Sequence, residues 1–162
     1  MINPTKRNDN VSLLAPWLQR QLMAAIKQCH AEGLMFHPFE CWRSPARQDE
    51  LYSQGRSSQG KIVTNARAWG SIHQFGLAVD IAAKHEGKWT WDETLCDYNK
   101  PAPIFREYGF EWGGSWNDRP HYQIACGISH GEMYEITKLH GVQWLWLLIE
   151  DRFQSRCKNI IA

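Results

Sequence analysis

An imidazole and a carboxylate, His73 and Asp80, lie seven residues apart. Residues 77–81 alternate between apolar side chains and small or acidic ones, which predicts a strand with Asp80 facing away from the core. Gly76 lets the chain turn before this strand, so His73 can fold back towards the Asp80 side. A neutral imidazole and a carboxylate on one side of a sheet are two of the ligands that a catalytic zinc ion uses. Taken alone, such a pair is more often an ordinary surface pair.

A second histidine and a second carboxylate, His121 and Asp118, follow a glycine-rich turn. Pro120 excludes a continuous helix here, so these two residues cannot form a helical pair. The alternation of polar and apolar residues after Pro120 again predicts a strand. With His73 and Asp80, His121 would complete three ligands and leave a fourth position for water, as in a hydrolytic zinc centre. Asp118 would then lie close to the metal without being needed as a ligand.

Three blocks of sequence carry a family resemblance in their order and spacing. They are WRSPARQ at 42–48, SxHxxGxAxD at 71–80 and DxPHY at 118–122. Together they resemble the D-alanyl-D-alanine metallopeptidase family, and more closely its L-alanyl-D-glutamate endopeptidase branch, which includes phage endolysins. The resemblance extends over about residues 34–124.

The resemblance implies roles for five residues. Zinc would be held by His73, Asp80 and His121. Asp118, three positions before the last histidine, occupies the place of the family's general base. Arg43 lies where the family places an arginine against the scissile carbonyl, and it would stabilise the developing oxyanion. The sequence contains no HExxH motif, so a helix-borne site of the thermolysin type is excluded.

Two further positions have both a functional and a structural interpretation. Gln48 occupies the position of a substrate-contacting residue in the family, although a solvated helical glutamine fits the sequence nearly as well. Ser71, two residues before His73, could donate a hydrogen bond to substrate or satisfy a turn, and the sequence favours neither. The histidines His37, His130 and His140 lie outside every motif and are predicted to have no role at the site.

The substrate that the resemblance implies is the stem peptide of peptidoglycan, cleaved between L-Ala and D-Glu. A D-Ala-D-Ala carboxypeptidase or dipeptidase is the alternative, but those relatives commonly have Glu-x-Trp-His at the place of residues 118–121. An alternative of another class is a non-catalytic, metal-bearing, cell-wall-binding module, because the fold also resembles the signalling domain of hedgehog proteins. Such a module would not need Asp118 or Arg43, so their presence favours an enzyme.

Composition narrows the class of protein. The chain has 162 residues, of which 43% are hydrophobic and 22% are charged, as expected for one globular domain. A net charge of +1 gives no reason to expect nucleic acid or an anionic membrane as a partner, and we expect a monomer. Nine tryptophans would fit either an aromatic, polymer-binding surface or a tryptophan-rich core, and we favour the core.

Cysteine usage and the first residues predict where the protein is made. Five cysteines without a CxxC pair argue against a thiolate zinc site and indicate free thiols in a reducing compartment. The polar first residues do not resemble a secretory signal peptide. We therefore expect an endolysin of phage or prophage type, made in the host cytoplasm and reaching the wall after membrane permeabilisation. A cytoplasmic recycling peptidase of a bacterium would share these features.

The expected fold class is α+β, a small antiparallel sheet flanked by helices with zinc on the sheet face. Residues 1–128 would form the catalytic domain, and residues 129–162 a helical extension packed on it. A membrane-touching helix is the alternative for this tail, although its mixed charges argue against strong binding to anionic lipid. The longest apolar run, 144–149, is too short to span a bilayer.

The periodicity of apolar residues predicts the individual elements. Helices are expected near 15–32, 45–54, 101–108, 132–139 and 142–156. Strands are expected near 34–42, 77–81, 110–112 and 121–124, and the segment 82–99 is expected to be irregular.

Overall fold

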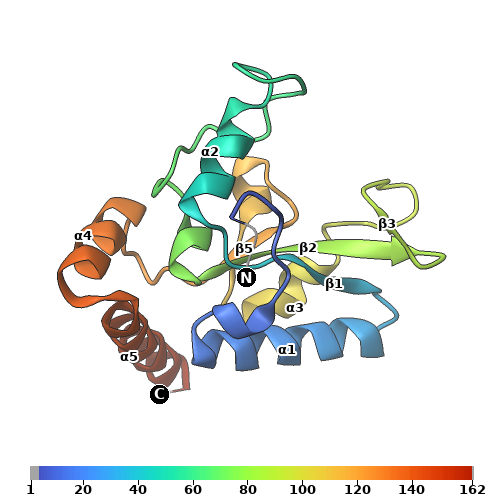
Figure 1. Cartoon of the computed structure of the whole chain (residues 1–162). Helices are drawn as coiled ribbons and strands as arrows, with labels where there is room; N and C mark the ends of the chain where they lie inside the picture. The colour runs from blue at the N-terminus through green and yellow to red at the C-terminus, as the bar shows by residue number, and fades with distance from the viewer. Residues whose placement is uncertain (1–3, 162) are drawn as a thin grey trace.

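The computed structural model describes the backbone of residues 4–161 and the side chains of residues 4–156. A five-stranded antiparallel sheet lies at the centre of the molecule, and its strands follow the order β1-β2-β5-β4, with β3 pairing to β2 (Figure 1). The strands are β1 (Phe36–Glu40), β2 (Ala78–His85), β3 (Lys88–Thr90), β4 (Glu111–Trp112) and β5 (His121–Gln123). The expected α+β class with a small antiparallel sheet is confirmed.

Five α-helices surround the sheet in the described part of the chain. They are α1 (Pro16–Ala31), α2 (Pro45–Ser53), α3 (Pro101–Glu107), α4 (His130–His140) and α5 (Val142–Ile161). Three short 3-10 helices, η1 (Val11–Leu13), η2 (Ile72–Phe75) and η3 (Gly113–Trp116), join them. Helices α1 and α3 lie along one face of the sheet, whereas α2 lies on the opposite side (Figure 1).

One face of strand β2 packs into the hydrophobic core. Its side chains Val79 and Ile81, with the preceding Leu77, are fully buried in one cluster with residues of α1 and with Tyr122 of β5. Because side chains alternate along a strand, Asp80 faces away from this cluster, as the sequence pattern predicted. The core therefore fixes the direction in which the candidate ligand points.

The segment 82–99 differs from the sequence prediction. It was expected to be irregular, but β2 continues to His85 and forms a hairpin with β3. The turn has positive φ at Glu86 (49°) and Gly87 (77°), a conformation that glycine adopts without cost. The sequence pattern missed β3 because this strand buries no face: Lys88 and Trp89 are exposed and Thr90 is only half-buried.

The two C-terminal helices pack on the rest of the molecule. Leu145 and Ile149 of α5 are fully buried in the same cluster as α1 and β2. The indole of Trp146 donates a hydrogen bond to the Phe75 carbonyl at 2.6 Å, at the end of η2. Within residues 4–161, no helix is long and apolar enough to cross a membrane.

The expectation of a tryptophan-rich core is wrong. Of the nine tryptophans, only Trp17 is fully enclosed, at 4% exposure. Five are between 36% and 52% exposed, namely Trp69, Trp89, Trp91, Trp116 and Trp144. The core is instead built from aliphatic side chains, phenylalanine and tyrosine, which leaves indole rings on the surface.

Candidate metal centre and active site

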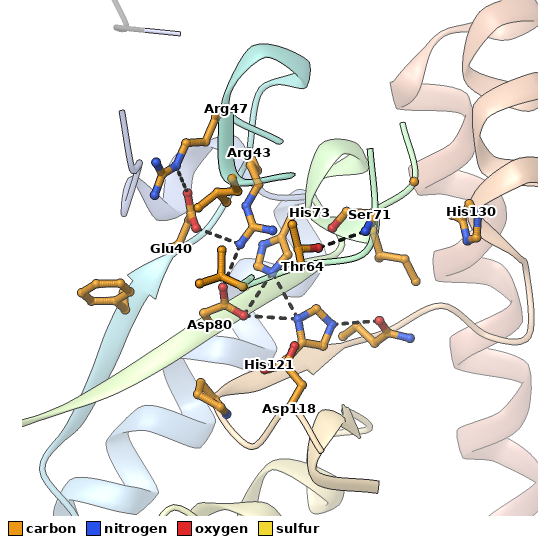
Figure 2. Close-up of a pocket in the computed structure, with 18 of the residues that line it drawn as sticks. Glu40, Arg43, Arg47, Thr64, Ser71, His73, Asp80, Asp118, His121 and His130 are labelled. Carbon is orange, nitrogen blue, oxygen red and sulfur yellow. Dashed lines mark hydrogen bonds and ion pairs between the residues drawn. The ribbon is translucent and has the colours of Figure 1, made fainter. Parts of the chain in front are cut away.

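The three predicted ligands converge at one point. One ligand atom from each of His73, Asp80 and His121 lies within 4.8 Å of the others. Asp80 and His121 are directly paired across β2 and β5, so their side chains leave the sheet on the same face. His73 reaches them from η2 (Figure 2).

The closest atoms of this cluster are two ring nitrogens and one carboxylate oxygen. The Nε2 atom of His73 lies 3.1 Å from Nδ1 of His121, and both face Oδ1 of Asp80, at 3.1 Å and 3.2 Å. The other ring nitrogens have acceptors: Nδ1 of His73 lies 2.7 Å from the Cys41 carbonyl, and Nε2 of His121 lies 2.9 Å from Oε1 of Gln123. When those nitrogens donate their protons, the facing nitrogens carry lone pairs.

Three lone pairs pointing at one spot fit a cation. Two imidazole nitrogens and a carboxylate oxygen are the donor set of catalytic zinc sites. The acceptors behind both rings are the partners that metal-ligating histidines normally have. The residues present therefore fit a zinc ion.

Gly76 makes the approach of His73 possible. It has a left-handed conformation, with φ of 67°. A Cβ atom at this position would lie 2.9 Å from the Leu13 carbonyl oxygen, closer than real side chains come. The turn between η2 and β2 therefore needs glycine, in agreement with the sequence prediction.

Burial and charge shift the pKa values of the ligands. Burial lowers the pKa of His73, which favours the neutral imidazole that a metal binds. Burial would raise the pKa of Asp80, but the two histidines and a neighbouring guanidinium hold it well below its usual value. Burial would also lower the pKa of His121, but the hydrogen bond and negative charge of Asp80 raise it. Asp80 is therefore a carboxylate at neutral pH.

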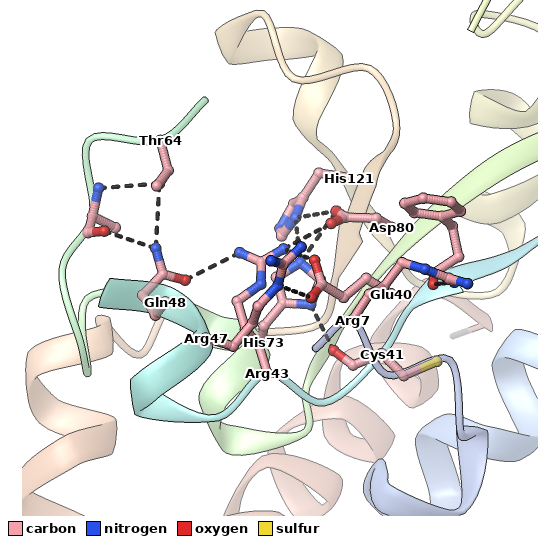
Figure 3. Close-up of polar contacts among 12 residues, drawn as sticks. Arg7, Glu40, Cys41, Arg43, Arg47, Gln48, Thr64, His73, Asp80 and His121 are labelled. Atoms are coloured by element: carbon pink, nitrogen blue, oxygen red, sulfur yellow. Dashed lines mark hydrogen bonds and ion pairs between the residues drawn. The ribbon is translucent and has the colours of Figure 1, made fainter. Parts of the chain in front are cut away.

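Arg43 contacts the second oxygen of Asp80. Its Nη2 atom lies 2.9 Å from Oδ2 of Asp80 and 2.8 Å from Oε2 of Glu40 (Figure 3). Arg47 in turn contacts the other Glu40 oxygen at 3.2 Å. Arg43 is only 9% exposed, so these pairs are shielded from solvent. The arrangement leaves Oδ1 of Asp80 for the histidines and fixes the carboxylate plane.

Gln48 lies behind Arg43 rather than in the cavity. It is fully buried, accepts a hydrogen bond from Arg43 at 3.1 Å and donates to the Ala66 carbonyl at 2.7 Å. These contacts tie Arg43 to the segment before η2. The structure thus places Gln48 as a support of Arg43. Its burial contradicts the alternative of a solvated glutamine, and the substrate contact implied by the family resemblance stays a prediction.

Asp118 and Ser71 both line the cavity in front of the ligands. Asp118 is an exposed residue, and its backbone is fixed by the Gly113 carbonyl at 2.9 Å and by the His121 amide at 3.1 Å. The atoms that surround the Asp118 carboxyl in the cavity displace water from it although the residue remains exposed, and this desolvation, together with the negative charge of Asp80, raises its pKa. Asp118 is not part of the ligand cluster, as the sequence predicted, and both residues face the space in which a substrate would lie.

The cavity has a volume of about 830 Å³ and is wide enough for a substrate larger than a dipeptide. Its walls include residues to which the sequence analysis gave no role at the site: Glu40, Trp91, Trp116 and His130. An acidic residue in a predicted apolar strand, three positions before Arg43, was the available signal for Glu40. Trp91 lies in a loop, Trp116 ends the short helix η3 and His130 begins α4, so none of them carries a periodic signal.

The fold and the site together describe an α+β domain in which His73, Asp80 and His121 form a candidate metal site in an open cavity. Residues 64–124 match a family model described as D-alanyl-D-alanine carboxypeptidase, and this segment contains all three ligands and Asp118. The resemblance to the D-alanyl-D-alanine metallopeptidase family is therefore confirmed.

Two particular relatives belong to the endopeptidase branch. The chain is 42% identical over 96 residues to the peptidoglycan L-alanyl-D-glutamate endopeptidase CwlK of Bacillus subtilis (strain 168). This match covers 52% of the present chain and 58% of CwlK. The crystal structure of the L-Ala D-Glu endopeptidase ChiX of Serratia marcescens superposes with a TM-score of 0.53 at 29% identity, covering 75% of this chain and 91% of ChiX.

Proposed function

We propose that the protein is a zinc-dependent peptidase that hydrolyses the L-Ala–D-Glu bond of the peptidoglycan stem peptide. The observation that carries this proposal is the convergence of three ligand atoms at the floor of an open cavity, with the Asp118 carboxyl beside them. The names of both relatives support the choice of bond.

When bound, zinc supplies Lewis-acid chemistry, which polarises a carbonyl and increases the acidity of water. The ligands His73, Asp80 and His121 would hold it. Asp118 accepts the proton of the attacking water and then delivers it to the leaving amine nitrogen. Its place on the cavity wall in front of the ligand cluster suits it to both transfers.

Arg43 acts first as a positioning residue. Its guanidinium binds Asp80 and Glu40 and also borders the cavity. Holding Oδ2 of Asp80 directs Oδ1 to the histidines. The second role, stabilisation of the oxyanion, stays a prediction from the family resemblance.

The cellular role that we propose is that of an endolysin, acting as a monomer on the cell wall. His73, Asp80, His121 and the cavity in front of them are formed by residues of this chain. Cys29, Cys41 and Cys96 are free thiols, which supports synthesis in a reducing compartment. Burial raises the pKa of Cys29 to about 11 and that of Cys41 to about 12, so both are unreactive.

Digestion of purified sacculi tests the choice of bond. We expect new amino termini that begin with D-Glu after treatment with the zinc-loaded protein. Release of D-Ala instead would show the D-Ala-D-Ala carboxypeptidase reaction. Zinc binding without either product would indicate a binding module.

A further inference from the structure

Two tryptophans line the catalytic cavity while much of their surface stays in water. Trp91 is 49% exposed and Trp116 is 52% exposed. Single exposed apolar side chains are common and need no explanation. Two indoles on the walls of the cavity that holds the ligand cluster are a different case, because they border the space in which a substrate would lie.

Trp91 is held as a platform. Its ring stacks on Tyr98, with centroids 5.8 Å apart and planes 19° apart, and it meets Phe39 edge-on at 5.0 Å. Tyr98 is itself only 3% exposed and donates a hydrogen bond to the Thr90 carbonyl at 2.9 Å. One face of the Trp91 ring is thus covered by a fixed neighbour, and its exposed surface is available for a ligand.

Trp116 is brought to the metal ligands by a glycine turn. Its ring centroid lies 6.1 Å from that of His121. A Cβ atom at Gly113 would collide with the Asp118 carbonyl, and one at Gly114 would collide with the Trp112 ring. Only glycines therefore allow η3 to place Trp116 and Asp118 side by side next to His121.

The floor and the walls of the cavity differ in chemistry. The floor carries ligands, carboxylates and guanidinium groups, which suit the peptide backbone and carboxylates of a stem peptide. L-Ala and D-Glu offer no ring or large apolar group that would cover an indole. A pyranose ring does, because its C–H face is apolar and its hydroxyls remain in water. The L-Ala of the stem is joined to the glycan strand, so a sugar lies next to the scissile bond.

We propose that Trp91 and Trp116 bind sugar rings of the glycan strand, so that the enzyme selects stem peptides that are still attached to glycan. This proposal rests on the proposed function and adds a specificity site to it. A bound sugar would explain both the exposed surface of the two indoles and the cavity volume of about 830 Å³.

The test compares one stem peptide in two forms, linked to its disaccharide and free with an acetylated amino terminus. For the wild type we expect kcat/KM to be at least about tenfold higher on the linked form. Trp91→Ala and Trp116→Ala should each reduce that ratio several-fold, mainly through KM. Trp144→Ala is the matched control, because Trp144 is 46% exposed but does not line the cavity, and it should keep the wild-type ratio.

A ratio near one in the wild type, or a loss in the variants that is equal on both substrates, would overturn the proposal. A protein that cleaves neither substrate would contradict the proposed function instead. Binding of an N-acetylglucosamine tetramer, measured by tryptophan fluorescence, tests the sugar site separately from the proposed peptidase function. Binding by the wild type and Trp144→Ala that weakens in Trp91→Ala supports the sugar site whatever the activity, and equal affinity in all three proteins opposes it.

Discussion

Each of the two candidate ligand histidines has a protein acceptor behind its ring, and this acceptor decides which ring nitrogen would face a metal. Cys41 supplies a carbonyl to His73, and Gln123 supplies an amide oxygen to His121. Removal of such a partner typically lowers metal affinity or activity by about 10- to 100-fold. The sequence motifs pointed to the candidate ligands but not to these acceptors. The Cys41 carbonyl reaches His73 only through the fold, and Gln123, which shares a strand face with His121, belongs to no motif.

Asp118→Asn separates proton transfer from metal binding. We expect the variant to keep its zinc and to lose activity by about 10²- to 10⁴-fold, because an amide cannot accept the proton of water. Zinc content by mass spectrometry and cleavage of peptidoglycan check the two parts. Loss of zinc, or full activity with zinc present, would show that Asp118 has another role.

Arg43→Lys tests positioning of Asp80. Lysine keeps the charge but has no planar fork, so it cannot hold Asp80, Glu40 and Gln48 together. We expect zinc affinity to fall by about 10-fold or more along with activity. Unchanged zinc affinity with reduced kcat would instead favour a role for Arg43 at the oxyanion alone.

The sequence alone could not show whether Arg43 positions Asp80 or stabilises the oxyanion. It also could not show whether Gln48 contacts substrate or has only a structural role. Motif spacing predicts which residues gather, and all of the predicted ligands do gather. Which atom of Arg43 contacts which carboxylate depends on Glu40, a buried residue that no motif includes.

At the scale of elements, helix α4 begins with a reciprocal cap. The Ser129 hydroxyl accepts a hydrogen bond from the Glu132 amide at 3.3 Å, and the Glu132 carboxylate accepts bonds from the Ser129 hydroxyl and amide at 2.7 Å and 2.9 Å. The hydrogen bonds from Ser129 lower the pKa of Glu132 below its usual value. The stability that this cap gives to the start of α4 therefore depends on pH.

Ser129→Ala should destabilise the protein by about 1 kcal/mol at pH 7, the usual effect of a lost cap. Since the folded-state pKa of Glu132 is lower than in the unfolded chain, the stability from these bonds is present above the unfolded value and is lost as the pH falls through the folded one. The difference between variant and wild type should therefore shrink as the pH falls below the usual pKa of a glutamate and the Glu132 carboxylate becomes protonated. Urea unfolding at several pH values measures it, and a constant difference would contradict the coupling.

The α-helices and the strands β1, β2, β4 and β5 were predictable, whereas β3 and the 3-10 helices were not. Helix α1 was expected near 15–32 and spans Pro16–Ala31, because sixteen residues show the helical period clearly. Strand β3 and the 3-10 helices, each of three or four residues, carry no period. The η2 turn was nevertheless foreseen at Gly76, because backbone conformation there depends on residue type.

At the scale of the molecule, the C-terminal helices share the core of the catalytic fold. The same helix offers a matched pair, because Leu145 is fully buried and Leu147 is 65% exposed. Leu145→Ala should lower the free energy of unfolding by about 2–5 kcal/mol, and Leu147→Ala should change it by less than about 0.5 kcal/mol.

Thermal unfolding should show one transition in both leucine variants if the tail and the sheet unfold together. A separate early transition in Leu145→Ala, with the rest unchanged, would show that residues 129–162 form an independent unit.

The central claim is that His73, Asp80 and His121 hold a zinc ion that cleavage of peptidoglycan requires. Metal content measured together with hydrolysis of purified peptidoglycan, before and after chelation, tests it most directly. We predict about one zinc per chain, loss of cleavage on chelation and recovery on adding zinc. A protein that binds no zinc although its three ligands are intact, or that cleaves peptidoglycan equally well after complete metal removal, would contradict the account.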